Sequence, residues 1–457
     1  MNAIRNRIAL YCFSGVVALA PLPFGSTDEI IVAAWAVVLG GILVFSIPLS
    51  PTRAQSSFLI LGSIVVIVWA GVLFAQTTSS EPLTSHFGDR IWSRASDILH
   101  RPLAPRIAVV RDQSLSSAGP QIVAALALFC GFLLGEKRAS ARLLLSVVAW
   151  SGVIYGIYAV VSFALDPTSV LGREKVAYRS VLTGTFINRN TAAVYFGVCA
   201  NLWLLRLLRG ISGPTFRVRR YQLTGLIQSG GSNQVTLSFA AFILLLSATF
   251  MTGSRAGSLL FIFTSFGVLI WAFWRTEESP WCALVGGAVL LMVLMAVVGA
   301  GIAGRVAAEG LVDSARVSVY RSVLRLIAEH PLWGTGLGTF ASVFPSYRPS
   351  DISSFGVWDR AHSTPLELCA EQGIPFAVLV VFMVGLIFVR LINGIRRRRE
   401  GRIFPLFAGI ALALTVAHSL VDFSLQIPGL TIVVMGMVGV GLAQCATQSN
   451  RNAVASL

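Results

Sequence analysis

The sequence has few charged residues for its length and almost no lysine. Only 12% of its 457 residues are charged, Lys137 and Lys175 are its only lysines, and 55% of the residues are hydrophobic. Soluble domains carry about 25% charged residues. The composition therefore argues against an ordinary soluble protein and indicates a protein of the lipid bilayer.

The sequence also lacks a cysteine pattern typical of a metal site or a disulfide framework. There is no CxxC pair, and the six cysteines lie mostly in apolar stretches, at Cys12, Cys130, Cys199, Cys282, Cys369 and Cys445. We interpret them as small core residues. The net charge of +15 would suit nucleic acid. A membrane explains the basic residues better, so membrane lipids are expected as partners and nucleic acid is not.

Long apolar runs recur along the whole chain. Each has roughly 17 to 24 residues, the length that crosses the hydrocarbon core as a helix. They predict an all-α polytopic membrane protein with about 12 transmembrane helices, forming one transmembrane domain over residues 1–457. The first run follows Arg5 and Arg7 as a signal peptide would, but no small-residue cleavage site follows it, so we interpret it as the first spanning helix. The predicted spans are 8–24, 29–48, 57–76, 119–135, 143–165, 190–205, 235–252, 256–274, 281–303, 374–394, 403–422 and 428–446.

The basic residues predict the orientation. With the N-terminus inside, the cytoplasmic loops hold 18 of the 35 basic residues and only four acidic residues, whereas the outer side holds 16 of each. Positive charge collects on the cytoplasmic side of inner-membrane proteins. We therefore expect a bacterial inner-membrane protein with both termini in the cytoplasm.

Two outer segments are long enough to carry function, residues 77–118 and residues 304–373, and both are expected in the periplasm. In the first, the spacing of apolar residues in RIWSRASDIL predicts a short interfacial helix. The second is a long, partly helical loop before the tenth span. It contains an apolar stripe of Val317, Tyr320, Val323, Leu324 and Ile327 that ends at His330-Pro331, which predicts a helix followed by the glycine-rich turn GTGLGTF.

Arginines stand out on the predicted outer side. Arg189 lies in FINRNTAA, Arg255 in MTGSRAGS, Arg316 in the long loop, and Arg360 close to His362. Arginine binds phosphate through two parallel hydrogen bonds, a geometry that suits a diphosphate. Because the whole chain has only two lysines, the preference for arginine over lysine at these positions has a simpler explanation in the overall composition. Arg255 sits in a very short turn at membrane depth, where a charge is costly and indicates function more than snorkelling.

Two histidines are candidates for chemistry. His362 precedes a predicted helix in AHSTPLELCAEQGIP and could accept a proton from an attacking hydroxyl, although a polar residue that caps the helix is the simpler interpretation. His418 and Asp422 are four residues apart, so they would share one helical face and could hydrogen-bond each other. Two such ligands are too few for a metal site. GTGLGTF has no preceding strand or following lysine, so it is read as a turn and not as a nucleotide site.

The ordered motifs resemble those of the O-antigen ligase and O-antigen polymerase superfamily. They are GTFINRNTAA, TGSRAG, Arg316 with Tyr320 leading into HPLWGTGLGTF, and AHSTPLELCAEQGIP, followed by HSLVDF. In many members an asparagine follows the loop histidine, where this chain has Ser363. The diagnostic part of the resemblance covers roughly residues 170–385.

The resemblance implies a metal-independent, inverting membrane glycosyltransferase without a cofactor. Such an enzyme transfers a glycan from undecaprenyl diphosphate to an acceptor sugar at the periplasmic face, in lipopolysaccharide or surface polysaccharide biosynthesis. His362 and Arg255 would be catalytic, with His362 as the base. Arg189, Arg316 and Arg360 would contact the diphosphate or the glycan. The possible supporting residues are Asn188, Asn190, Glu371, His418 and Asp422.

Three alternatives stay open. The acceptor could be the lipid A-core, as in a ligase, or a growing polysaccharide, as in a repeat-unit polymerase, since both reactions would use the same residues. Twelve helices with both ends inside are also typical of a secondary transporter, but ionisable groups collect at the outer helix ends and not at the membrane centre. A non-catalytic scaffold would not need Arg255 and His362 on the same side.

Overall fold

The computed structural model describes residues 2–48, 50–211, 230–273, 314–352, 357–398 and 400–455, and almost all of its elements are helices. The elements are α1 (Asn2–Leu19), η1 (Phe24–Ser26), α2 (Glu29–Ser46), α3 (Arg53–Thr77), α4 (Glu81–Phe87), α5 (Ile91–Leu99), α6 (Gln113–Ser116), α7 (Gly119–Leu134), α8 (Arg138–Leu165), β1 (Ser169–Val170), β2 (Arg173–Glu174), α9 (Arg189–Ile211), α11 (Gly230–Met251), α12 (Arg255–Phe273), α14 (Ser314–Glu329), α15 (Phe340–Val343), η3 (Phe344–Tyr347), α16 (Thr364–Gln372), α17 (Ile374–Arg397), α18 (Ile403–Ser419), η4 (Ser424–Gln426) and α19 (Pro428–Ala455).

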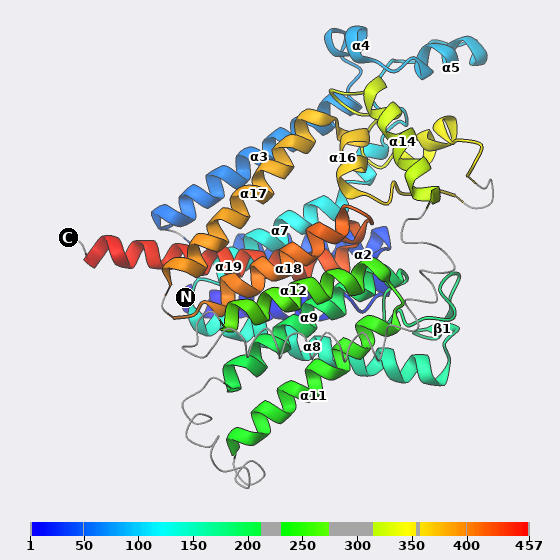
Figure 1. Ribbon diagram of the computed structural model, residues 1–457. Helices are drawn as coiled ribbons and strands as arrows, with labels where there is room; N and C mark the ends of the chain where they lie inside the picture. The colour runs from blue at the N-terminus through cyan, green and yellow to red at the C-terminus, as the bar shows by residue number, and fades with distance from the viewer. Residues whose placement is uncertain are drawn as a thin grey trace.

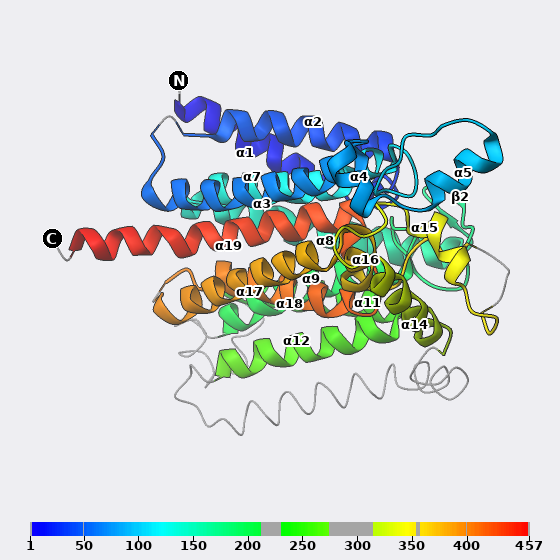
Figure 2. The same cartoon turned by 90° about the horizontal axis from the view of Figure 1, so that it is seen from above.

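The long helices run roughly side by side, and the two ends of the bundle differ (Figures 1 and 2). Both chain termini lie at one end, which we call the terminal end. The short helices α4, α5 and α14–α16 and the small hairpin β1–β2 gather at the opposite end, which we call the loop end. The two segments that the sequence marks as long outer loops therefore meet at the same end of the molecule.

Nine helical segments within the described ranges are long and apolar enough to cross a membrane, and each overlaps a predicted span. The chain is thus a multi-pass membrane protein. The predicted span 403–422 corresponds to the shorter apolar helix α18, and the predicted span 8–24 corresponds to α1, which is not among the nine. The span 281–303 and the first part of the loop 304–373 lie outside the described residues. The number twelve stays a prediction.

Small residues let α7 and α19 approach closely. A Cβ atom on Gly131 would lie 2.1 Å from the backbone oxygen of Gly436, and one on Gly439 would lie 2.2 Å from the backbone oxygen of Leu128. Within a bilayer, apolar side chains gain little by leaving lipid, so close backbone packing of this kind stabilises helix pairs. This contact fixes α19 along α7 at the centre of the bundle.

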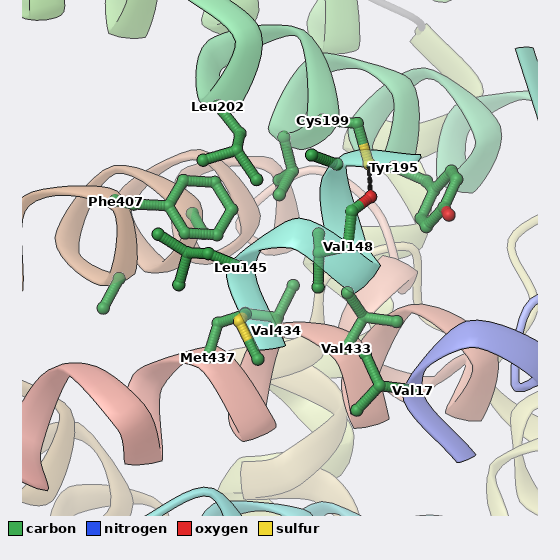
Figure 3. Close-up of a cluster of buried hydrophobic side chains, with 14 of the residues drawn as sticks. Val17, Leu145, Val148, Tyr195, Cys199, Leu202, Phe407, Val433, Val434 and Met437 are labelled. Carbon is green, nitrogen blue, oxygen red and sulfur yellow. Dashed lines mark hydrogen bonds between the residues drawn. The ribbon is translucent and has the colours of Figure 1, made fainter. Parts of the chain in front are cut away.

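Five helices share an apolar core (Figure 3). Val17 from α1, Val148 from α8, Leu202 from α9, Phe407 from α18 and Val434 from α19 belong to one buried cluster. Because α9, α18 and α19 pack together here, the segments at their loop-end termini are held close to one another as well.

The short helices at the loop end follow the sequence only in part. α5 confirms the predicted helix at RIWSRASDIL, and none of its residues is buried. α14 confirms the predicted helix before His330, but its buried stripe is Val319, Val323, Leu326 and Ile327, while Leu324 is exposed. The predicted inclusion of Leu324 is wrong, because the face that packs on α16 lies one position away. The antiparallel hairpin β1–β2 was not expected in an all-α chain.

Candidate active site at the loop end

Two of the predicted arginines are the first residues of spanning helices. Arg189 begins α9 and Arg255 begins α12. Asn188 Oδ1 accepts the backbone N–H two residues further on at 2.7 Å, and Ser254 Oγ accepts the N–H three residues further on at 3.2 Å, so each side chain caps its helix. The positive end of each helix dipole adds to the charge of its arginine, and this combination favours anions.

Helix packing brings these two helix starts together. A Cβ atom on Gly257 would lie only 2.6 Å from the Cβ of Ala193, so the first turns of α9 and α12 touch. Only glycine permits this approach. The guanidinium carbon of Arg189 lies 5.1 Å from the ring centroid of Tyr178, which supports its planar group from one side. Arg189 and Arg255 therefore start neighbouring helices at the same end of the bundle.

Asp422 is fully buried and collects polar partners from three parts of the chain. Its carboxylate accepts hydrogen bonds from Asn190 Nδ2 and from the N–H of Phe423, and Arg316 Nη2 lies 3.7 Å away. Arg316 also donates to the backbone oxygen of Val421 at 2.7 Å. A buried carboxylate is stable only with such partners. Asp422 thus ties α9, α14 and the turn after α18 together and orients Arg316, whose side chain is 26% exposed.

The predicted sharing of one helical face by His418 and Asp422 is wrong. α18 ends at Ser419, because the next two N–H groups donate three residues back and tighten the chain into a turn. His418 Nδ1 instead lies 3.0 Å from Ser424 Oγ, and Thr191 Oγ1 donates to the same oxygen at 3.5 Å. His418 is buried, and among the described residues its Nε2 has no hydrogen-bond partner.

His362 lies two residues before α16, as predicted, with its ring between two aromatic rings. The centroids of Trp358 and Phe423 lie 5.3 Å and 5.1 Å from its own. Tyr320 donates its hydroxyl hydrogen bond to the backbone oxygen of His362 at 2.8 Å, and the first residue of α16 donates to the backbone oxygen of Asp422. The φ angle of His362 is +52°, a conformation that costs a non-glycine residue about 1–3 kcal/mol and is common at functional sites.

Arg360 has a partner within the protein. Its Nη1 donates to Glu367 Oε1 at 3.2 Å, and the N–H of Ala361 donates to Glu367 Oε2 at 2.7 Å. Burial raises the pKa of Glu367, and the charge of Arg360 opposes this rise. The pair fixes the backbone immediately before His362. Arg360 therefore helps to position the segment that carries the histidine.

Glu371, one helical turn beyond Glu367, holds the glycine-rich turn. Its Oε1 accepts the N–H of Phe340 at 2.9 Å, and burial together with the charge of Glu367 raises its pKa to about 8. All three glycines of GTGLGTF have positive φ angles, which other residues rarely adopt. This geometry agrees with the predicted turn.

Gln76, at the end of α3, is a residue that the sequence did not single out. Its Nε2 donates to the backbone oxygens of Trp333 and Glu371 at 2.8 Å and 2.7 Å, and its Oε1 accepts the N–H of Leu337 at 3.1 Å. A second link is the hydrogen bond that the N–H of Val109 donates to the backbone oxygen of Thr335 in the turn, at 2.9 Å. Gln76 is fully buried, so it locks the segment after α3 to the glycine-rich turn. The only signal in the sequence is an amide in the last turn of an apolar run.

The structure therefore joins most of the predicted site residues into two connected groups. One group surrounds Asp422, and the other surrounds Glu367. Their members among the predicted residues are Asn188, Arg189, Asn190, Arg316, His418 and Asp422 in the first, and Arg360, His362 and Glu371 in the second. The ring of His362 contacts Phe423, the neighbour of Asp422 in the chain. Arg255 joins the first group through helix packing, and its sharing of a pocket with His362 stays a prediction. Within the described ranges, no three His, Cys, Asp or Glu side chains gather as a metal site would require.

Comparison with known families matches one segment of the chain, which carries part of this site. Residues 240–381 match the family model described as O-antigen ligase. The match includes Arg255, Arg316 and His362, together with Arg360 and Glu371. The resemblance to the O-antigen ligase and polymerase superfamily is thus confirmed, and it points to a membrane enzyme of the glycosyltransferase type. No curated protein matches the chain.

Proposed function

We propose that the protein transfers a glycan from undecaprenyl diphosphate to an acceptor sugar at the periplasmic face of the inner membrane. The observation that carries the proposal is the cluster at the loop end, where Arg189 and Arg255 begin adjacent helices, Arg316 is held by Asp422, and His362 lies against Phe423. This arrangement gathers positive charge and a histidine, the candidate base, at one end of the bundle.

The donor supplies its own activation. A sugar linked to a diphosphate already has a good leaving group, so the protein mainly needs to stabilise the departing negative charge and to remove the acceptor's proton. In the proposed step, the acceptor oxygen attacks the anomeric carbon, the bond to the diphosphate breaks, and His362 takes the hydroxyl proton. A single displacement inverts the anomeric configuration and needs neither a metal ion nor a cofactor.

The arginines would bind and stabilise the diphosphate in two different ways. Arg189 and Arg255 combine their own charge with helix dipoles, which suits the fully charged leaving group. Arg316 is oriented by Asp422 and by a backbone carbonyl, so its guanidinium group is held in a fixed position at the loop end. Ligation to lipid A-core and polymerisation of repeat units would use the same step and differ only in the acceptor.

Donor affinity tests the assignment of the arginines. We expect Arg189→Gln and Arg316→Gln to weaken binding of the undecaprenyl diphosphate-linked donor, since each removes a charged hydrogen-bond donor that is worth about 1.5–3 kcal/mol. Arg111→Gln is the matched control, because Arg111 also belongs to the loop end but is largely exposed and paired with Asp112. Equal donor affinity in all three variants would remove the arginine cluster from the proposal.

Orientation is tested separately. We place both termini in the cytoplasm and the loop end in the periplasm, because of the one-sided distribution of basic residues. A cysteine replacing Ser93 on α5 should react with a membrane-impermeant thiol reagent in intact spheroplasts, measured against the unsubstituted protein. If the cysteine reacted only after the membrane was opened, the loop end would face the cytoplasm and the proposed orientation would be wrong.

A further inference from the structure

A second cationic site lies at the terminal end, away from the proposed active site. A cavity of about 540 Å³ opens there between the start of α8, the last turns of α9 and α12, and the start of α18. Among the described residues, its charged lining consists of Arg138, Arg142, Arg209 and Arg402 with one acidic residue, Glu400. Even with that carboxylate ionised, the described lining residues carry three more positive than negative charges.

Two of these arginines are already engaged by the protein. Arg138 Nη1 donates to Glu400 Oε2 at 2.7 Å, and Arg402 donates to the backbone oxygen of Arg398. Arg142 and Arg209 are exposed, and neither takes part in an ion pair among the residues that the structure describes. The engaged pair shapes the wall of the cavity, and the other two can turn their guanidinium groups towards a ligand.

The rest of the lining is apolar. Besides Gly401, the wall is completed by Leu205, Trp271, Ile403, Phe404 and Leu406, and all of these apolar side chains except Trp271 are buried. The ends of spanning helices lie at the membrane–water interface, where tryptophan is common. A free phosphate would use only the arginines, whereas a lipid would place its phosphate on the arginines and its upper acyl chains on the apolar wall.

We propose that this cavity binds the headgroup of an anionic diacyl phospholipid. The bound lipid would fasten the ends of α8, α9, α12 and α18 to one another. Two of these helices, α9 and α12, begin at Arg189 and Arg255 at the opposite end of the bundle. The lipid would therefore stabilise the bundle that carries the candidate active site. The proposal concerns lipid binding and holds whether or not the protein transfers a glycan.

Direct binding tests this site. The purified protein is delipidated and titrated with phosphatidylglycerol or phosphatidylethanolamine, and bound lipid is counted by native mass spectrometry. We expect one tightly bound phosphatidylglycerol and at least tenfold weaker binding of phosphatidylethanolamine. Arg142→Gln combined with Arg209→Gln should weaken phosphatidylglycerol binding about tenfold to hundredfold, since each basic residue near a lipid surface contributes about 1 kcal/mol.

Arg396→Gln combined with Arg397→Gln is the control, since both residues are exposed at the same end but do not line the cavity. It should retain wild-type lipid binding. Equal losses in the two double variants would mean diffuse attraction to the basic end and would overturn the site. Displacement of the lipid by millimolar inorganic phosphate would mean a simple anion site and would overturn the assignment to a lipid. Because bound lipid is counted directly, failure of glycan transfer would not affect the result.

Discussion

Replacement of Gln76 by alanine should loosen the loop end without disturbing the spanning helices. The change removes three hydrogen bonds, two of them buried and one partly buried, from the contact between α3 and the glycine-rich turn. The backbone oxygen of Glu371 keeps a second partner, the N–H of Gly336 at 3.0 Å. The N–H of Leu337 and the backbone oxygen of Trp333 lose the partner that Gln76 provides.

The expected cost follows from these two groups. A buried polar group without its partner costs about 1–3 kcal/mol, so about 2–6 kcal/mol is the upper range for the two. The oxygen of Trp333 is only partly buried, and water can enter the space left by the side chain, so the value should lie in the lower half of that range. The effect should extend to activity. The glycine-rich turn contacts the C-terminal end of α16, and His362 lies just before the start of the same helix.

Hydrogen exchange measures this directly. The amides of residues 334–340 should exchange about 30-fold faster or more in Gln76→Ala, which corresponds to about 2 kcal/mol, while amides within α17 keep their wild-type rates. Gln113→Ala is the control, because the side-chain amide of Gln113 donates to Ser117 Oγ within its own segment, at 3.0 Å, and has no other hydrogen-bond partner among the described residues. Unchanged exchange in the turn of Gln76→Ala would refute the role of Gln76.

Further predictions concern pH, catalysis and packing. Glu371 has a pKa of about 8 when folded and 4.5 as its ordinary value, so its stabilising contribution is complete below pH 4.5 and is lost as the pH rises through 8. Thermal unfolding in detergent should therefore show a stability that falls between pH 5 and pH 9 in the wild type and falls less in Glu371→Gln; parallel curves would contradict this. His362→Ala should lower turnover by about 10²–10⁴ with donor affinity retained, and near wild-type turnover would remove it as the base. Arg255→Lys should lower both donor affinity and turnover, because lysine cannot form the bidentate contact, and full activity would argue against that contact. Gly131→Val should destabilise the α7–α19 pair by about 1–3 kcal/mol, measured by thermal unfolding, and an unchanged midpoint would contradict the close approach to Gly436.

The spanning helices could be predicted because their signal is local. An apolar run of sufficient length has few alternatives in a bilayer, and the nine described segments that are long enough to span all overlap predicted runs. The residues at which the helices begin and end were less predictable. α3 starts at Arg53 and not at residue 57, because Thr52 and Gln55 form a capping box that extends the helix beyond its apolar part. α18 stops at Ser419, and the turn that follows places Asp422 beside Asn190 of α9.

The site was predictable in its residue types but not in its connections. Arginines and a histidine near helix starts can be read from the sequence, and the structure places Arg189 and Arg255 at helix starts. The partners of Gln76 are 257 and 295 residues away along the chain, and no local pattern reports such contacts. The spacing of four residues between Glu367 and Glu371 was visible, but the buried carboxylate pair beside Arg360 depends on tertiary packing.

Glycan transfer by the purified protein tests the central claim most directly. The protein is reconstituted in liposomes with an undecaprenyl diphosphate-linked glycan, with lipid A-core or repeat-unit acceptors in parallel reactions and a chelator in every one, and products are identified by mass spectrometry and anomeric analysis. We predict transfer to one of the two acceptors with inversion at the anomeric carbon and release of undecaprenyl diphosphate. Folded protein that transfers glycan to neither acceptor, or only after a divalent ion is restored, would contradict the account.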